Sequence, residues 1–148
     1  MSLINLIIPT STARAGMSVL DVFRECVRAD VPGIPFQDVD GNIIGKASIR
    51  HVLKETLIPD FMVKHAHLLG DEIQHLNIQE SQLSEVLLLD IEPFVLPDIT
   101  VVSSSTPIAK ALATMEGLDT TYLFVIDEGV YKGVVSVMAI ARTMLVDA

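Results

Sequence analysis

Two stretches of the sequence decide the fold: residues 34–48, IPFQDVDGNIIGKAS, and residues 122–136, YLFVIDEGVYKGVVS. Each consists of two apolar runs separated by an acidic residue and a glycine, Asp40-Gly41 in the first stretch and Glu128-Gly129 in the second. An Asp-Gly pair between apolar runs is a strong hairpin signal, because the tight turn needs left-handed backbone. Each stretch therefore predicts a β-hairpin.

Each hairpin leads into a helix. The strands are predicted over residues 34–39, 42–47, 122–127 and 130–135, and the helices over residues 49–56 and 137–145. Ser48 and Ser136 lie at the junctions, where a hydroxyl can accept a hydrogen bond from the first turn of the helix. Both serines are therefore predicted N-caps.

The two stretches belong to a longer internal repeat. A shift of 88 positions, with no insertion or deletion, aligns LIIP at residues 6–9 with FVLP at residues 94–97. It also matches Thr12 with Thr100, Ser18 with Thr106, Phe36 with Phe124, Gly41 with Gly129, Gly45 with Gly133 and Ser48 with Ser136. A constant register of this length predicts a duplication, and repeated units usually pack together to bury a shared face.

A helix is predicted before the first hairpin. Ser18 is its N-cap, with Asp21 three residues later, and Leu20, Phe23 and Val27 form one apolar stripe.

The second copy repeats this helix. Thr106 is the predicted N-cap, and Pro107 takes the first helical position, where a missing N–H costs nothing. Ile108, Ala111 and Met115 form the stripe, and Gly117 permits the helix to end.

The chain is expected to form one module over residues 1–148. Its parts are a first repeat at residues 6–56, a helical connector at residues 57–93 and a second repeat at residues 94–145. Within the connector, Pro59-Asp60 and Gly70-Asp71 are breaker and cap pairs that divide it into a short helix and a longer one. The longer helix has an apolar face formed by Ile73, Leu76, Leu83 and Leu87.

Composition excludes several classes of function. The formal net charge is −9 and no basic stripe occurs, which argues against a nucleic-acid partner. The apolar run from Leu3 to Ile8 is stopped by Pro9, far short of a membrane span or signal peptide. The single cysteine, Cys26, lies on an apolar helical face and suits a cytoplasmic protein. A mean hydropathy of +0.50 exceeds what a small core needs, so a homodimer is expected.

The repeated unit of short strand, helix, hairpin and helix resembles the cystathionine beta-synthase (CBS) domain, and two copies resemble a CBS pair, or Bateman module. The resemblance rests on Thr near the first strand and on Gly-x-x-Ser closing each hairpin. It implies an α/β (α+β) fold in which the copies pack about a pseudo-twofold axis. It also implies that an adenosine-containing ligand, such as AMP, ADP, ATP or S-adenosylmethionine, binds in a cleft between the copies, with no cofactor required.

Candidate binding residues follow from this resemblance and from the charge around the helix starts. They are Thr12, Arg14, Lys46, Ser48, Arg50, His51, Thr100 and Ser136. The family's signature has an Asp three residues after the Ser, which hydrogen-bonds the ribose, but His51 and Ala139 stand at these positions here. The first copy is favoured as the site, because Lys46, Arg50 and His51 surround Ser48 and can attract an anion.

Other functions have weaker support in the sequence. The main alternative is a ligand-free module for dimerisation or protein interaction, with clefts that have lost their ligand. A metal site is not expected, because His65 and His67 lie on different faces of a helix. Of His75 and the neighbouring Asp71 and Glu72, only His75 and Asp71 have good spacing, and that pair stabilises a helix at least as readily as it binds a metal. No nucleophile elbow or phosphate loop occurs, so no catalytic activity is expected.

Overall fold

A computed structural model describes residues 2–70 and 78–146. The first half contains α1 (Val19–Ala29), β1 (Gly33–Gln37), β2 (Ile43–Ser48) and α2 (Ile49–Leu57). The connector contains α3 (Asp60–Lys64), η1 (Ala66–Leu68), α4 (Glu80–Leu87) and η3 (Glu92–Phe94). The second half contains β3 (Val101–Val102), α5 (Ile108–Gly117), β4 (Tyr122–Asp127), β5 (Val130–Ser136) and α6 (Val137–Val146). The mixed fold of two similar halves is confirmed.

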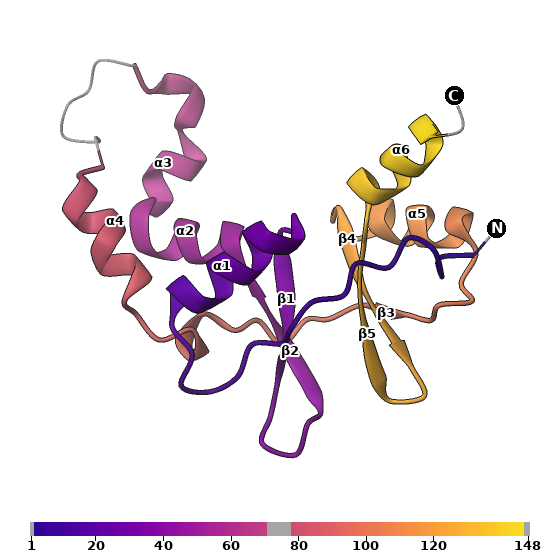
Figure 1. Ribbon diagram of the computed structural model, residues 1–148. Coiled ribbons are helices and arrows are strands. Elements are labelled where there is room, and N and C mark those ends of the chain that lie inside the picture. The colour runs from indigo at the N-terminus through magenta and orange to yellow at the C-terminus, as the bar shows by residue number, and fades with distance from the viewer. Residues whose placement is uncertain (1, 71–77, 147–148) are drawn as a thin grey trace.

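The two sheets stand side by side, and their helices lie toward the same end of the molecule (Figure 1). In the second half β3 pairs in parallel with β4, and β4 pairs antiparallel with β5. In the first half β1 and β2 form the antiparallel pair, and a single parallel bridge from Ala13 to Phe36 takes the place of β3.

The two halves exchange their leading segments. The backbone N–H of Ile8 donates to the carbonyl of Val134 at 2.8 Å, and Val134 donates back at 2.9 Å. Lys46 and Leu96 make the same pair of bonds, at 2.8 and 3.0 Å. Ile8 and Leu96 are related by the shift of 88, as are Lys46 and Val134, so the two exchanges are copies of one another.

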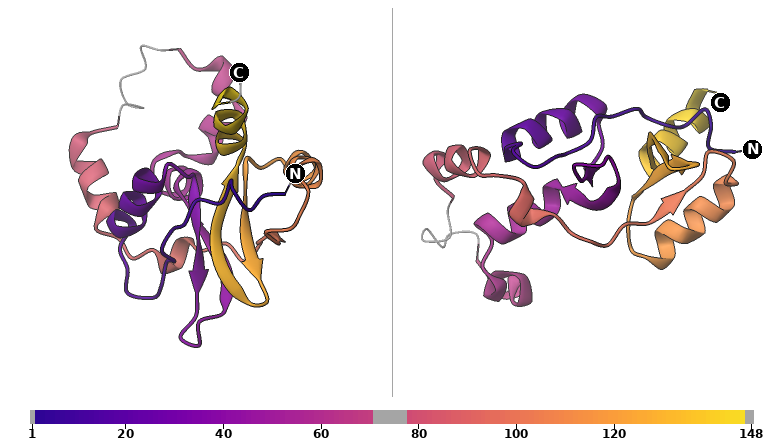
Figure 2. Two further views of the ribbon diagram at one scale, coloured as in Figure 1. Left: turned by 45° about the vertical axis from the view of Figure 1, so that its right-hand side comes forward. Right: turned by 90° about the horizontal axis from the view of Figure 1, so that it is seen from below.

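Each crossing segment also packs into the other half's core. Leu3 and Leu6 are buried among residues of α5, β4, β5 and α6, whereas Ile91 is buried among residues of the first half. Seen from below, the two crossings pass on opposite sides of the paired sheets (Figure 2, right). This reciprocal arrangement is the pseudo-twofold packing that the sequence predicted.

The constant offset of 88 is wrong for the middle of each repeat. Val31 donates to the carbonyl of Cys26, and the matching bond runs from Thr120 to Met115, so both partners are shifted by 89. One extra residue therefore precedes β3 in the second repeat. The hairpins compensate, because the first turns through Asp38–Asn42 whereas the second uses two residues, Glu128 and Gly129.

This one-residue error explains a wrong helix face. In α1 the buried stripe consists of Val19, Val22, Cys26 and Ala29, and the predicted stripe residue Val27 is 74% exposed. In α5 the predicted Ala111 and Met115 are buried, as expected, and Ile108 packs against them.

The same error mispaired the two phenylalanines. Phe36 packs against the helices of its own half, and its structural counterpart is Val125, which does likewise. Phe124 lies on the opposite face of its strand and joins the core cluster of the first half.

The helix caps were predicted with one error. Ser18 and Asp21 form a reciprocal capping box, and Ser48 and Ser136 each cap the helix that follows them. Thr106 is not a cap, because α5 begins after Pro107 and the Thr106 hydroxyl accepts instead from the backbone N–H of Ser103 at 3.1 Å.

The connector differs in detail from its prediction. Val86 is the buried residue of α4, and the predicted Leu83 is exposed. Residues Ile73 and Leu76 of the predicted face lie outside the described residues. Within the ranges 2–70 and 78–146, no helix combines the length and apolar character needed to cross a bilayer.

Candidate functional site

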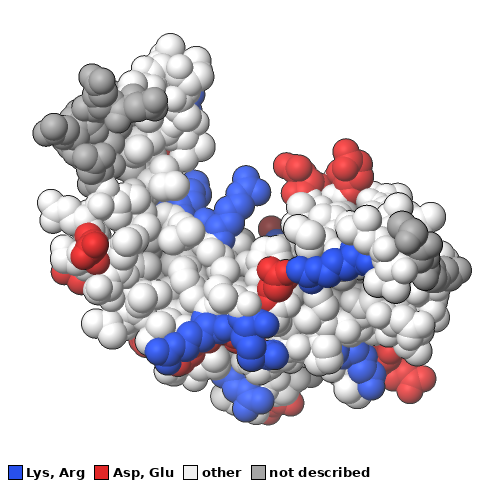
Figure 3. Space-filling view, turned by 45° about the horizontal axis from the view of Figure 1, so that its top comes forward, with Lys and Arg blue, Asp and Glu red and all other residues white. Residues whose placement is uncertain are grey.

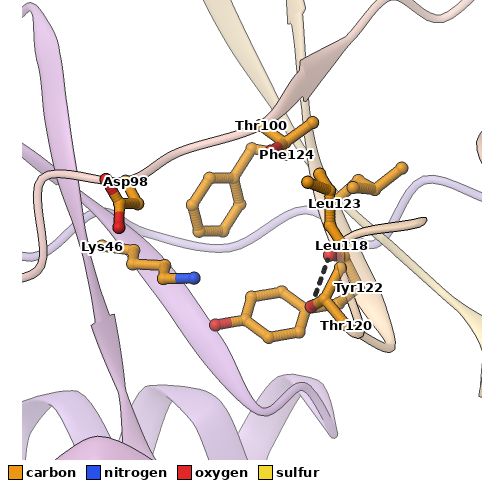
Figure 4. A pocket seen from close by; sticks show the side chains of 8 residues that line it. All are labelled: Lys46, Asp98, Thr100, Leu118, Thr120, Tyr122, Leu123 and Phe124. Atoms are coloured by element: carbon orange, nitrogen blue, oxygen red, sulfur yellow. Dashed lines mark hydrogen bonds between the residues drawn. The ribbon is translucent and has the colours of Figure 1, made fainter. Parts of the chain in front are cut away.

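A cavity of about 290 Å³ opens between the two repeats, beneath the second crossing segment (Figure 4). Its walls are Lys46, Asp98, Thr100, Leu118, Thr120, Tyr122, Leu123 and Phe124. Lys46 comes from β2 of the first repeat, and the other residues come from the crossing segment, from β4 and from the loop that precedes β4. Because both repeats supply walls, the shape of the cavity depends on how they are arranged.

Backbone pairing fixes Lys46 at this cavity. Two hydrogen bonds hold Lys46 to Leu96, and Asp98 and Thr100 follow on the same crossing segment. The side chain of Lys46 extends into the cavity toward the ring of Tyr122, with Asp98 nearby (Figure 4). The cavity therefore contains one cation, one carboxylate and the hydroxyls of two threonines, Thr100 and Thr120.

Two aromatic rings form another wall of the cavity. Side chains alternate along a strand, so Tyr122 and Phe124 share the face of β4 that turns away from the helices. Their ring centroids are 5.7 Å apart with an interplanar angle of 67°. Burial raises the pKa of the Tyr122 phenol, and a hydrogen bond with Ser48 partly opposes that rise.

Tyr122 fits because its neighbour in the first repeat is a glycine. A Cβ atom at Gly33 would lie 2.5 Å from the Tyr122 hydroxyl and 2.9 Å from the carbonyl oxygen of Ala47. The ring thus fills space between the sheets and lies between Ser48 and the cavity. Ser48 hydrogen-bonds Tyr122 but does not itself line the cavity.

The predicted site residues do not all lie together. Two of them, Lys46 and Thr100, line the cavity. Arg50 is exposed on the first turn of α2, and the backbone N–H of His51 donates to the Ser48 hydroxyl at 3.5 Å. Neither Arg50 nor His51 lines the cavity.

Thr12 and Arg14 belong to a different surface. With the Gln37 amide nitrogen turned toward Thr12, Gln37 donates to the Thr12 hydroxyl at 2.9 Å and accepts from Arg14 Nε at 3.0 Å. Arg14 also lines a separate hollow of about 370 Å³ beside Phe36 and Ile44. These two residues are therefore not brought together with Lys46 and Thr100.

Ser136 is buried, and its hydroxyl accepts from the backbone N–H of Ala139 at 3.1 Å. It lines a mainly apolar cavity of about 490 Å³ between the repeats, together with residues such as Cys26 and Met138. Near this cavity, Asp30 at the end of α1 makes an ion pair with Arg142 of α6.

Sequence reasoning missed Asp98, Thr120, Tyr122 and Phe124. The alternation in YLFVID separates Tyr122 and Phe124 from Leu123 and Val125, and this was the signal that two aromatic rings share one face. Matching Phe124 to Phe36 concealed it, because the true counterpart of Phe36 is Val125, on the other face of the strand.

The described residues hold no group of three or more metal-ligating side chains. His65 and His67 are exposed near α3, and His75, Asp71 and Glu72 lie outside the described residues. Cys26 is buried, and burial raises the pKa of its thiol to about 12, so it is poorly suited to act as a nucleophile. On the face seen in Figure 3, Lys and Arg form separate groups and not a continuous band.

Comparisons with known proteins agree with this geometry. Residues 90–146 match the family model of the CBS domain. A putative signal-transduction protein with CBS domains from Burkholderia ambifaria superimposes with a TM-score of 0.69 at 14% identity, over 99% of this chain and 96% of its own. A CBS domain-containing protein from Bacillus anthracis has a TM-score of 0.65 at 18% identity, over 100% of this chain and 95% of its own.

A third similar structure is the CBS domain pair of protein MJ0100, solved in complex with 5′-methylthioadenosine and S-adenosyl-L-methionine. Its TM-score is 0.65 at 13% identity, over 100% of this chain and 98% of its own. The comparison with curated proteins gave no match. As a whole the chain thus has the fold of a CBS-domain pair. Within it, residues 90–146 match the CBS-domain model and overlap the second repeat that the sequence predicted at residues 94–145.

Proposed function

We propose that this protein is a regulatory CBS-domain pair that binds an adenosine-containing ligand in the cavity between its repeats. The observation that carries the proposal is the composition of that cavity. It combines two aromatic rings with a lysine from the opposite repeat and with two threonine hydroxyls. The rings suit an aromatic base, the threonine hydroxyls suit a sugar, and the lysine suits an anionic group.

Each part of such a ligand has a partner in the cavity. The rings of Tyr122 and Phe124 offer apolar area to the base, and Lys46 offers its ammonium group to a phosphate. Thr100 and Thr120 can hydrogen-bond the ribose hydroxyls, and His51 and Ala139 stand where the family's signature has its ribose-binding Asp. The carboxylate of Asp98 repels a highly charged triphosphate, so a monophosphate or an uncharged adenosyl compound is favoured over ATP.

Ligand binding would act on the arrangement of the repeats, without catalysis. A ligand held by Lys46 on one side and by Tyr122 on the other stabilises the arrangement in which both contacts form. The effect of the ligand on any partner can be no larger than the difference between its affinity for this arrangement and its affinity for the alternative one. The likeness to the MJ0100 domain pair, whose structure holds adenosyl compounds, supports this class of ligand.

The test is a thermal-shift and calorimetry series with adenosine, 5′-methylthioadenosine, S-adenosylmethionine, AMP, ADP and ATP. A compound present at 100 times its Kd should add about 2.7 kcal/mol to the free energy of unfolding. Lys46→Ala should weaken AMP binding at least tenfold, whereas Lys110→Ala, an exposed lysine on α5, should leave it unchanged. If no compound moves the melting curve, the ligand proposal is wrong.

A second function, assembly with another protein chain, is favoured by a different observation. Helix α6 is apolar on nearly every side, with Ala139 and Ile140 buried and Met138, Met144 and Leu145 exposed. A helix of this kind is normally covered. Such a role for the module, including a homodimer, is compatible with ligand binding and is tested separately by the size of the protein in solution.

A further inference from the structure

We infer that this pair has one working ligand cleft, because the chain's own Tyr131 and Glu25 close the second. This inference rests on the proposed function and adds the number of ligands bound and the residues that set it. The two crossing segments pass on opposite sides of the sheets (Figure 2), and the pseudo-twofold relation gives each of them an equivalent position against the other half. The cavity described above lies beneath the second segment, at Asp98 and Thr100.

The equivalent cleft lies beneath the first segment. The pseudo-twofold relation that pairs Ile8 with Leu96 places Thr10 and Ser11 where the other cleft has Asp98 to Thr100. Both residues are engaged by side chains of this chain, one from each repeat.

Tyr131 of β5 engages Thr10. Its hydroxyl lies 2.6 Å from the Thr10 hydroxyl, and its ring makes an edge-on contact with Phe124 at a centroid distance of 6.3 Å. The counterpart of Tyr131 in the first repeat is Ile43, which has no hydroxyl and leaves the other cleft without this contact.

Glu25 of α1 engages Ser11. Its carboxylate accepts from the backbone N–H of Ser11 at 2.5 Å, although only 12% of its side chain is exposed. Arg28 donates to the same carboxylate at 2.5 and 2.9 Å and thereby holds it in place. A carboxylate thus satisfies a backbone amide that an incoming ligand would otherwise meet.

The open cleft has neither of these contacts. With the offset of 89 that applies here, the counterparts of Glu25 and Arg28 are Thr114 and Gly117. Thr114 hydrogen-bonds the carbonyl of Lys110 in its own helix, at 2.8 Å. The two positions therefore share their backbone pairing but differ in their side chains. Glu25, Arg28 and Tyr131 occupy the closed side, and its counterparts of Lys46, Tyr122 and Phe124 are Val134, Gly33 and Pro35.

The experiment exchanges the closing residues for their counterparts from the open cleft. The wild type and the double variant Glu25→Thr, Tyr131→Ile are titrated by calorimetry with adenosine and AMP. We expect one molecule per wild-type chain. In the variant we expect a second, weaker site, which binds AMP no more tightly than adenosine because Val134 stands where the first cavity has Lys46. Two molecules on the wild type, or no second molecule on the variant, would overturn the inference and leave the proposed function standing.

A second measurement needs no ligand. Hydrogen exchange followed by NMR should find the Ser11 amide protected in the wild type and at least tenfold less protected in Glu25→Gln. Rapid exchange in the wild type would overturn the inference. If neither compound binds either protein, the proposed function fails, and the Ser11 amide alone then decides whether the second cleft is closed.

Discussion

Gly45 shows how a single residue permits the exchange of segments between the repeats. A Cβ atom there would lie 2.6 Å from the carbonyl oxygen of Leu96 and 2.7 Å from a methyl group of Val95. Its repeat partner Gly133 faces the carbonyl of Ile8 in the same way, with a φ of 147° that disfavours other residues. The repeated glycine in Gly-x-x-Ser is therefore explained by the close approach of a neighbouring backbone.

Replacing Gly45 with alanine should destabilise the protein by about 1 to 3 kcal/mol, the usual cost of forcing an extra carbon into a packed site. Gly117→Ala is the matched control, because nothing lies within 4 Å of its added Cβ and the residue ends a helix. Urea denaturation measures both. A Gly45→Ala variant as stable as the wild type would contradict the crossing at Leu96.

Ser48 and Ser136 are equivalent caps with unequal geometry. Ser136 is 4% exposed and accepts from Ala139 at 3.1 Å, whereas the Ser48 contact is 3.5 Å. Ser136→Ala should therefore cost about 1 kcal/mol, and Ser48→Ala should cost less. Thermal unfolding of the two ligand-free variants makes the comparison, and the reverse order would show that cap geometry does not decide their roles.

At the scale of elements, helices and strands were well predicted because their signals are local. The capping box at Ser18 and the turns at Gly41 and Gly129 place element ends within a residue or two. The face of α1 was wrong because two stripes compete and the offset of 88 aligned the wrong one with the stripe of α5. Val19, Val22 and Cys26 have the same spacing as Leu20, Phe23 and Val27, and only tertiary packing distinguishes them.

The contact between α1 and the first crossing segment should make stability depend on pH. Hydrogen bonds from Arg28 and Ser11 lower the pKa of Glu25 from its ordinary 4.5 to about 2. The unfolded chain then takes up the proton first as pH falls. This stabilisation is complete above pH 4.5 and is lost progressively as pH falls toward 2.

Denaturation curves between pH 2 and 6 measure this dependence. Glu25→Gln should lose stability at pH 6 and show a shallower decline below pH 4.5 than the wild type. In Arg28→Ala the decline should be smaller and should end at a higher pH, because the main cause of the lowered pKa of Glu25 is gone and its folded-state pKa moves back toward 4.5. Identical pH curves for wild type and Glu25→Gln would contradict the contact.

At the scale of the whole molecule, the sequence predicted two packed copies but only part of the site. Lys46 and Thr100 were identified from their positions in the repeat, and both line the cavity. Tyr122 and Asp98 were missed, because which residues face the cleft depends on how the sheets meet. The ligand and the dimer both remain predictions.

The apolar surface of α6 should form a dimer. Met138 is 55% exposed on this helix, and Met138→Asp would place a charge in the interface. Light scattering at micromolar concentration should find a dimer for the wild type and a monomer for the variant. Val39→Asp, at a hairpin tip where the residue is 97% exposed, should remain dimeric. A monomeric wild type would contradict the prediction.

The reciprocal exchange of leading segments makes the two halves inseparable even without a continuous chain. A protease cut between α3 and α4 would yield two pieces, each of which contributes a backbone-paired segment and buried leucine or isoleucine side chains to the other. The nicked protein should therefore elute as one species until it is denatured. Two fragments produced separately should recover the native fold on mixing, and neither should fold alone.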